Sequence, residues 1–149
     1  MEQSTAGVSE SAMRAAREVR VVFSRLRRRL RETYETSELT PSQTSVLSRL
    51  DKEGDASVSD LAVAERVRHQ SVASAVGVLA DRGLVSRRPD PDDGRRQLIS
   101  VSEGGRKFLA DRRRAGEEWL TRVFEDQFTE AERQTVIEAM AVLDRLARS

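Results

Sequence analysis

Residues 57–102 read SVSDLAVAERVRHQSVASAVGVLADRGLVSRRPDPDDGRRQLISVS, and their spacing predicts two short helices joined by a turn. Ser57 with Asp60 three residues later is a capping box, the pattern that opens a helix. A break near residues 66–68 ends this helix, and a second helix runs to Gly83. The inward face of the second helix is expected at Val72, Ala75, Val76 and Leu79, which recur at helical spacing.

The same stretch continues into a predicted β-hairpin. Residues 84–88 and 97–101 have the composition of short strands, and Asp93-Gly94 between them is a strong hairpin signal. Helix, turn, helix and hairpin in this order are typical of a winged helix-turn-helix. In such units the second helix enters the major groove of DNA, and the hairpin beside it can reach the minor groove.

Two helices are expected before this block. Apolar residues recur at helical spacing from Ala12 to Tyr34, which predicts one long amphipathic helix. A shorter helix follows, with Thr40 as its cap, Pro41 at its first position and Gln43 completing a capping box. Its buried face and its end are expected at Val46, Leu47, Leu50 and Gly54.

Two more helices are expected after the hairpin. Ser102 caps the first of them, and Thr129 with Glu132 opens the last. The last helix is expected to bury Val136, Ile137, Met140, Leu143 and Leu146. The terminal helices carry more apolar surface than one small winged domain covers, which indicates a helical interface between two copies. Trp119, Phe124 and Phe128 belong either to that interface or to an intramolecular core.

The amino-acid composition limits the classes of function that the protein can have. The 149 residues include one His and no Cys, so disulfides, thiol chemistry and cysteine-based zinc sites are excluded, and a metal site is not expected. No nucleophile motif, spaced carboxylate pair or phosphate loop is found, so we expect neither an enzyme nor a cofactor. The chain lacks a signal-peptide pattern and a long apolar run, which favours the cytoplasm.

Charge is unevenly distributed although the net charge is only +1. Residues 14–31 hold eight arginines and one acid, Glu18, a local excess of 8 − 1 = +7. Such a run fits either a polyanionic partner or a solvated helix face. An architectural protein that binds nucleic acid without sequence preference therefore remains the alternative to a sequence-specific regulator, and a steep salt dependence would favour it.

Residues 57–105 resemble the MarR family of bacterial transcription regulators. The resemblance lies in Leu61-Ala62, in DRGLVSR at residues 81–87, in the wing motif of Asp93 and Arg95, and in LISVSEGG at residues 98–105. The family usually has Thr in place of Ser102. It also has an apolar residue followed by Gly where this chain has Glu65 and Arg66, and Pro or Ser where this chain has His69 and Gln70, so the turn geometry stays open.

The resemblance implies a mainly α fold with a small β-hairpin, in which a winged helix-turn-helix lies between dimerisation helices. The whole chain, residues 1–149, is expected to form one such domain, with the DNA-binding core at 41–102 and dimerisation helices at 10–36 and 103–147. The implied protein is a homodimeric repressor of a palindromic operator. A small aromatic effector is expected where Phe23, Leu26 and Leu47 supply apolar surface.

DNA contacts are expected at the start of the second helix of the pair. The candidates are Arg68, His69, Gln70, Ser71 and Ser74, because Gln pairs well with adenine and Arg with guanine. Ser71 could instead cap the helix, and His69 could be an ordinary surface imidazole.

The hairpin supplies the other candidates. Arg95 fits a narrow minor groove, and Asp93 could hold either that arginine or the turn. Arg96 is a further candidate; like Arg87 and Arg88, it could contact a phosphate or pair with Asp90 and Asp92. The alternative for the whole tip is a solvated hairpin.

Overall fold

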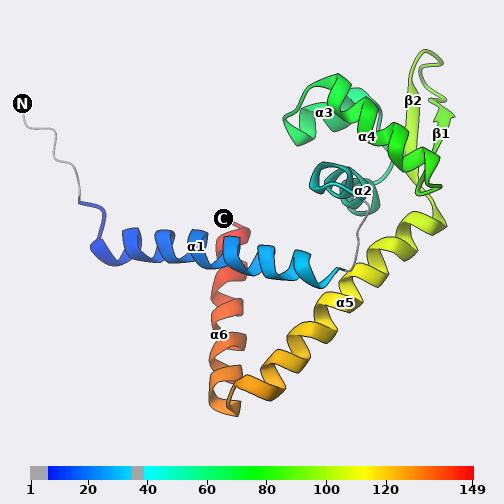
Figure 1. The fold of residues 1–149 in the computed structure, drawn as a ribbon. Helices are drawn as coiled ribbons and strands as arrows, with labels where there is room; N and C mark the ends of the chain where they lie inside the picture. The colour runs from blue at the N-terminus through cyan, green and yellow to red at the C-terminus, as the bar shows by residue number, and fades with distance from the viewer. Residues whose placement is uncertain (1–6, 35–38) are drawn as a thin grey trace, which may run out of the picture. The chain divides into compact units, whose positions relative to one another are not determined.

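The computed structural model describes residues 7–34 and 39–149 (Figure 1). Contacts divide the chain into two units, residues 1–35 with one helix and residues 36–149 with all other elements, and each unit is described by itself. The elements within the described residues are α1 (Glu10–Thr33), α2 (Pro41–Glu53), α3 (Val58–Glu65), α4 (His69–Asp81), β1 (Val85–Pro89), β2 (Gln97–Val101), α5 (Glu103–Gln127) and α6 (Glu130–Ala147).

The capping patterns of the sequence set where α2 and α3 begin. The Thr40 hydroxyl accepts from the Gln43 backbone N–H at 3.2 Å, and the Thr40 N–H donates to the Gln43 side chain at 3.0 Å. Ser57 and Asp60 form the same reciprocal pair at α3. Both capping boxes are confirmed, because they depend only on residues three apart in the chain.

We call the unit of residues 36–149 the winged unit. Its hydrophobic core lies where α2, α3, α4, the hairpin and the start of α5 meet. Leu47, Val76 and Leu79 are completely buried, and Leu61 and Ile99 are nearly so. The inward faces predicted for α2 and α4 are confirmed. Helical spacing alone identified these faces because each helix packs on one side only.

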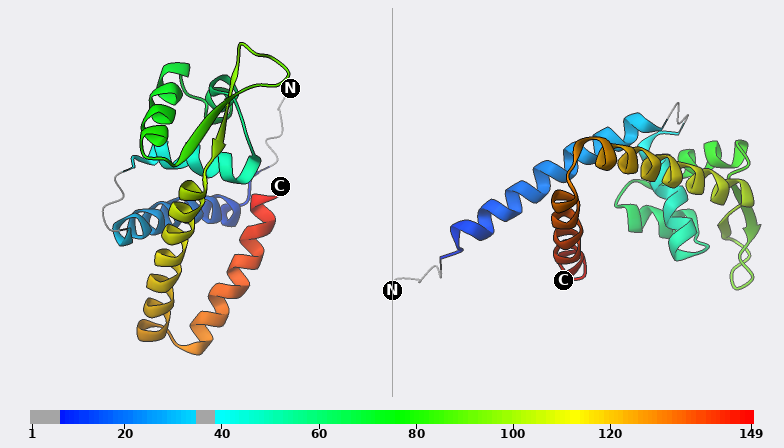
Figure 2. Two further views of the ribbon diagram at one scale, coloured as in Figure 1. Left: turned by 90° about the vertical axis from the view of Figure 1, so that its right-hand side faces the viewer. Right: turned by 90° about the horizontal axis from the view of Figure 1, so that it is seen from below.

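The predicted hairpin is confirmed, and its two strands are joined by a loop. β1 and β2 pair antiparallel from Val85 opposite Val101 to Pro89 opposite Gln97, and residues 90–96 connect them. Asp93-Gly94, the hairpin signal of the sequence, lies within this connection and does not form a two-residue turn. A turn closed by the Arg96 N–H on the Asp93 carbonyl lies inside a longer loop, seen from a second side in Figure 2. Gly94 has no positive φ, so its backbone does not adopt the conformation that such two-residue turns require.

A further backbone pairing ties the hairpin to the segment before α3. Ala56 and Ile99 exchange two backbone hydrogen bonds, at 3.2 and 2.8 Å. No local pattern predicts this bridge, because its partners are far apart in the sequence. It places β2 between β1 and the entry to α3.

The start of α5 is packed directly against the end of α4 and the hairpin. The Ser102 hydroxyl accepts from the Gly105 N–H at 3.1 Å and donates to the Gly83 carbonyl at 2.6 Å. Gly83 has a positive φ of 70°. A Cβ built on Gly105 would overlap the Leu84 carbonyl oxygen and lie 2.8 Å from the Val101 side chain. Only glycine fits this contact.

The apolar stripe of α6 is not buried in the single chain, contrary to the sequence-based expectation. Exposure reaches 60% at Ile137, 47% at Met140 and 58% at Leu146, and neither α6 nor α1 contains a buried residue. The helix predicted by the periodicity is confirmed, but periodicity does not specify what covers an apolar face. Residues 35–36, assigned to the first helix from the sequence, lie outside the described residues.

We predict that Gly105→Ala lowers the free energy of unfolding by at least about 2 kcal/mol, because the new methyl group meets rigid backbone and core atoms. The matched control is Gly77→Ala in the interior of α4, where a Cβ meets nothing within 4 Å. This control should raise stability by about 0.5–1 kcal/mol through helix propensity. Urea denaturation of both variants tests the pair, and equal stabilities would contradict the packing described for Gly105.

Candidate nucleic-acid interface

The turn between α3 and α4 has a left-handed residue at its centre. Arg66 has φ 56° and ψ 43°, the only positive φ at a non-glycine position within residues 7–34 and 39–149. The Arg66 N–H donates to the Ala62 and Val63 carbonyls, and the Val67 N–H donates to the Ala62 carbonyl. Arg66 therefore occupies the αL position where the resemblance leads one to expect glycine.

The first turn of α4 is exposed. Arg68, His69, Gln70, Ser71 and Ser74, the five residues expected to meet base edges, are all accessible. Arg68 is the N-cap residue, and no side chain caps the helix, so Ser71 does not have the capping role considered as its alternative. An uncapped N-terminus leaves backbone N–H groups for an anionic partner, as phosphate-binding helices do.

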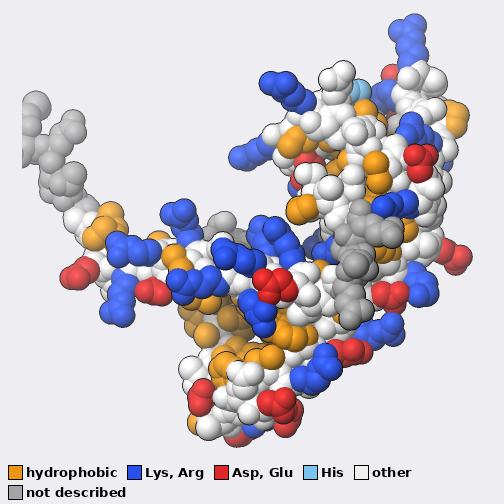
Figure 3. Space-filling view, in the orientation of Figure 1, with side chains coloured by type: hydrophobic (Ala, Val, Ile, Leu, Met, Phe, Trp, Pro, Cys, Tyr) orange, Lys and Arg blue, Asp and Glu red, His pale blue; other side chains and the backbone are white. Residues whose placement is uncertain are grey.

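The tip of the hairpin carries an exposed arginine on an ordered turn. Oδ1 of Asp93 accepts from the Arg95 backbone N–H at 3.1 Å, so Asp93 holds the turn and not the guanidinium. In the part of the chain that the structure describes, the Arg95 side chain is exposed and forms no ion pair. Figure 3 shows basic side chains projecting from the hairpin tip. The carboxylate thus shapes the loop while the guanidinium stays available.

Arg96 points to α3 instead of outward. Its Nη2 donates to the Asp60 carboxylate at 2.7 Å and to the buried Ser57 hydroxyl at 2.9 Å, and its Nε lies 3.9 Å from Asp90. The pairing with Asp90 expected from the sequence is thus present, and Asp60 is an additional partner. Arg96 joins the loop of the hairpin to the first turn of α3.

The pKa of Asp60 lies below its ordinary value of 3.8, first because the Ser57 side chain hydrogen-bonds it and further because Arg96 is near. The ionised carboxylate of Asp60 therefore stabilises the folded protein at pH values above 3.8. This contribution is lost as the pH falls through the lowered pKa.

Arg88 also pairs differently from the expectation. It donates to Asp55 at 2.6 Å, not to Asp90 or Asp92, since Asp55 lies just before the Ala56 bridge to β2. This contact lowers the pKa of Asp55, with a smaller contribution from Ser100. The bridge between Ala56 and Ile99, invisible in the sequence, is what brings Asp55 beside the hairpin.

The described residues offer neither of two other common kinds of interaction site, a membrane-spanning helix or a metal centre. No helix among them combines the length and apolar composition needed to cross a membrane. Within residues 7–34 and 39–149, no group of three or more His, Asp or Glu side chains is placed to hold a metal ion. The exposed start of α4 and the exposed arginine at the hairpin tip have the geometry that suits a nucleic acid.

Comparison with known proteins agrees with this geometry. Residues 37–96 match a model of the MarR family. An HTH-type transcriptional regulator of Mycobacterium bovis is 41% identical over 111 residues, which is 74% of this chain and 78% of that protein. The chain belongs to the MarR family. It is a DNA-binding transcriptional regulator with a winged helix-turn-helix.

Solved structures extend the likeness to the terminal helices. A crystal structure of a transcriptional regulator from Pseudomonas aeruginosa has a TM-score of 0.82 and 34% identity, and the match covers 95% of this chain and 99% of that one. A more distant structure is BpsR of Bordetella bronchiseptica, whose DNA binding is regulated by 6-hydroxynicotinic acid. It is 22% identical with a TM-score of 0.57, and the match covers 93% of this chain and 98% of that one, so this likeness concerns the fold alone.

We predict that Arg95→Ala weakens binding to the protein's DNA site by about 1–3 kcal/mol, the scale of one specific groove contact. Stability should not change, because the side chain lies outside the core. Fluorescence anisotropy on a duplex selected by the wild-type protein measures the loss. Arg113→Ala, which removes an exposed arginine from the middle of α5, is the matched control and should leave the affinity unchanged. Equal affinity for wild type and Arg95→Ala would exclude a role for the wing tip.

Proposed function

We propose that this MarR-family protein is a homodimeric repressor that reads a palindromic operator and releases it when a small aromatic molecule binds. The observation that carries the proposal is the exposed, uncapped first turn of α4, together with the exposed guanidinium of Arg95 on the hairpin of the same unit. These two features offer one major-groove and one minor-groove contact on a single unit.

The dimer is supported by apolar faces that the single chain leaves open. On α6, Ile137, Met140, Val142 and Leu146 are all more than 45% exposed. On α1, Val22 and Phe23 are exposed as well, and the arginines of residues 14–31 surround the apolar stripe. Monomeric proteins rarely expose contiguous apolar helix faces of this kind, so a second copy is the simplest partner.

Two-fold symmetry would set the form of the operator. A dimer presents two α4 helices related by its symmetry axis, and each meets the major groove about one helical turn, or roughly 10 bp, from the other. The operator is then an imperfect palindrome. A small dimer bound at a promoter blocks polymerase without needing an activation surface, which is why we propose repression.

The effector proposal needs one correction from the structure. Leu47, expected to line the ligand site, is completely buried in the core and has no surface to offer. Phe23 and Leu26 on α1 are 44% and 36% exposed and remain candidates. The regulation of BpsR by 6-hydroxynicotinic acid supports an aromatic ligand class. A panel of phenolic and heteroaromatic acids that leaves operator affinity unchanged would remove the effector from the proposal.

The alternative is an architectural protein that uses the arginine-rich face of α1 on nucleic acid of any sequence. Figure 3 shows basic side chains along α1, which is the observation in its favour. Its affinity would come from phosphate contacts, would fall steeply with salt and would be the same for all duplexes of one length.

The dimer proposal predicts that Ile137→Glu combined with Met140→Glu converts the protein to monomers, because four charges per dimer would be placed in an apolar interface. Operator binding should weaken at least tenfold, because one half-site supplies about half of the base contacts. Sedimentation velocity gives the oligomeric state. Gln134→Glu, on the same helix but outside the apolar stripe, is the control, and an unchanged mass for the double variant would refute this interface.

The central experiment is fluorescence anisotropy with the DNA directly upstream of the protein's own gene and random DNA of equal length, at two salt concentrations. Preference for the upstream DNA that survives moderate salt is the expected result. Gln70→Ala should reduce that preference more than it reduces binding to random DNA, since Gln70 is exposed at the start of α4. Equal, salt-sensitive binding to both duplexes, followed by no enriched sequence in an unbiased site selection, would favour the architectural alternative.

A further inference from the structure

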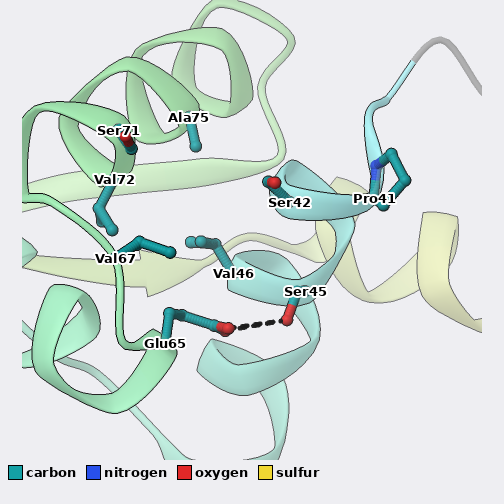
Figure 4. Close-up of a pocket in the computed structure, with 9 residues that line it drawn as sticks. All are labelled: Pro41, Ser42, Ser45, Val46, Glu65, Val67, Ser71, Val72 and Ala75. Carbon is teal, nitrogen blue, oxygen red and sulfur yellow. Dashed lines mark hydrogen bonds between the residues drawn. The ribbon is translucent and has the colours of Figure 1, made fainter.

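The carboxylate of Glu65 fastens the end of α3 to the side of α2. It accepts from the Ser45 hydroxyl at 3.0 Å and from Nε of Arg49 at 3.1 Å (Figure 4 shows the contact with Ser45). Arg49 is held in turn by Glu53, at 2.9 Å. Ser45, Arg49 and Glu53 are spaced four residues apart, so they lie on one face of α2. We call Glu65, Ser45 and Arg49 the Glu65 latch.

The latch is more than a surface ion pair. The side chain of Glu65 is only 15% exposed and that of Arg49 29% exposed, so both are largely withdrawn from water. The pKa of Arg49 is raised, first by its hydrogen bond to Glu65 and then by that to Glu53. A carboxylate so withdrawn from water depends on its partners, and losing one partner leaves it poorly compensated. The position is also the one where the family resemblance leads one to expect an apolar residue.

The latch lies next to the turn that leads into the DNA-reading helix. Arg66 and Val67 are all that separate Glu65 from Arg68, the N-cap of α4. Arg66 keeps its left-handed backbone although it is not glycine, so its surroundings must hold it there. The latch fixes the residue directly before this strained position.

A cavity separates α2 from the start of α4 on the same side. Its volume is about 260 Å³, and the residues that line it are Pro41, Ser42, Ser45, Val46, Glu65, Val67, Ser71, Val72 and Ala75. In Figure 4, Val46 and Val67 point toward one another across it, while Ser71 and Ala75 lie farther along α4. Val72 is buried in the core and holds one side of the first turn of α4, whereas the exposed Ser71 lines the cavity, so packing on α2 does not by itself fix the other side of this turn.

We propose that Glu65 is a positioning residue for DNA recognition: through Ser45 and Arg49 it sets where the first turn of α4 lies, and so controls operator preference without touching DNA. Releasing the latch would let this turn shift toward the cavity. Base contacts depend on exact placement, whereas phosphate contacts tolerate a shift, so specificity would fall before nonspecific affinity does. The inference rests on the proposed reading of the operator by α4.

Two variants distinguish a positioning role from a simple effect of charge on DNA affinity, because the two explanations predict opposite changes for one of them. Glu65→Gln removes a negative charge and, by electrostatics, should strengthen binding to any DNA. Arg49→Gln removes a positive charge and should weaken it. If the latch positions α4, both variants weaken operator binding, and they do so by similar factors. The direction of the Glu65→Gln effect therefore separates positioning from electrostatics.

The experiment compares a duplex selected by the wild-type protein from a random pool with a random duplex of the same length. For Glu65→Gln and Arg49→Gln we expect about a tenfold loss of affinity for the selected duplex, the size of one lost base contact. Affinity for the random duplex should change less than about threefold. The double variant should lose no more than the worse single variant, because both break the same contact.

Two further variants control for the change of charge and for a failure to fold. Asp51→Asn changes an equal charge at an exposed position of α2 and should leave operator preference at the wild-type value. Ser45→Ala removes one hydrogen bond to Glu65 without changing any charge, and should lower operator preference in the same direction as Glu65→Gln. Ser45→Ala also decides the question if Glu65→Gln fails to fold, which circular dichroism would reveal.

The outcomes distinguish a failure of the proposed function from a failure of the positioning role of Glu65. A wild-type protein that selects no sequence refutes the proposed function. A wild-type protein that prefers its selected duplex, with Glu65→Gln equally or more selective, refutes the positioning role alone. Folded Glu65→Gln, Arg49→Gln and Ser45→Ala variants that all lose preference for the selected duplex while keeping random-duplex affinity support it.

Discussion

The close approach of α5 to the end of α4 is the contact on which the winged unit depends. At Gly105 the α5 backbone lies against the Leu84 carbonyl and the side chains of Val101 and Leu47, with no room for a Cβ. Ser102 caps α5 and bonds the Gly83 carbonyl in the same place. The hairpin and the long helix are thereby fixed to the core at one point, and the small residues of SEGG are explained by this crowding and not by flexibility.

Arginine and carboxylate pairs tie α3 to its neighbours at both ends. Arg96 from the hairpin loop holds Asp60 at the first turn, and Arg49 from α2 holds Glu65 at the last. The Arg96–Asp60 pair is exposed, and pairs of this kind contribute little to stability, so its value lies more in fixing orientation. Arg96 and Arg49 therefore bind carboxylates of the protein itself. Arg68 and Arg95 remain on the surface, where an anionic partner can reach them.

The apolar faces of α1 and α6 stay exposed in the single chain, although their sequences have the pattern of helices with one buried side. Their periodicity is as regular as that of α2 and α4, yet they contain no buried residue, while Leu47 and Leu79 are completely buried. The difference in burial therefore does not come from the spacing of the apolar residues. A second surface is required to cover these helices, and the homodimer is our proposal for it.

Local sequence patterns specify the features that depend on near neighbours. Thr40 with Gln43 and Ser57 with Asp60 begin their helices through contacts three residues long, and Val76 and Leu79 reveal an inward face through helical spacing. These signals were enough for the order of elements and for the exposed start of α4. The partners of the long-range polar groups are set by the fold instead: Arg96 pairs with Asp60, Arg88 with Asp55, and Glu65 with Arg49. A charged side chain has many acceptors of equal chemistry, and which one it meets is set by the packing of elements distant in sequence, which no local pattern records.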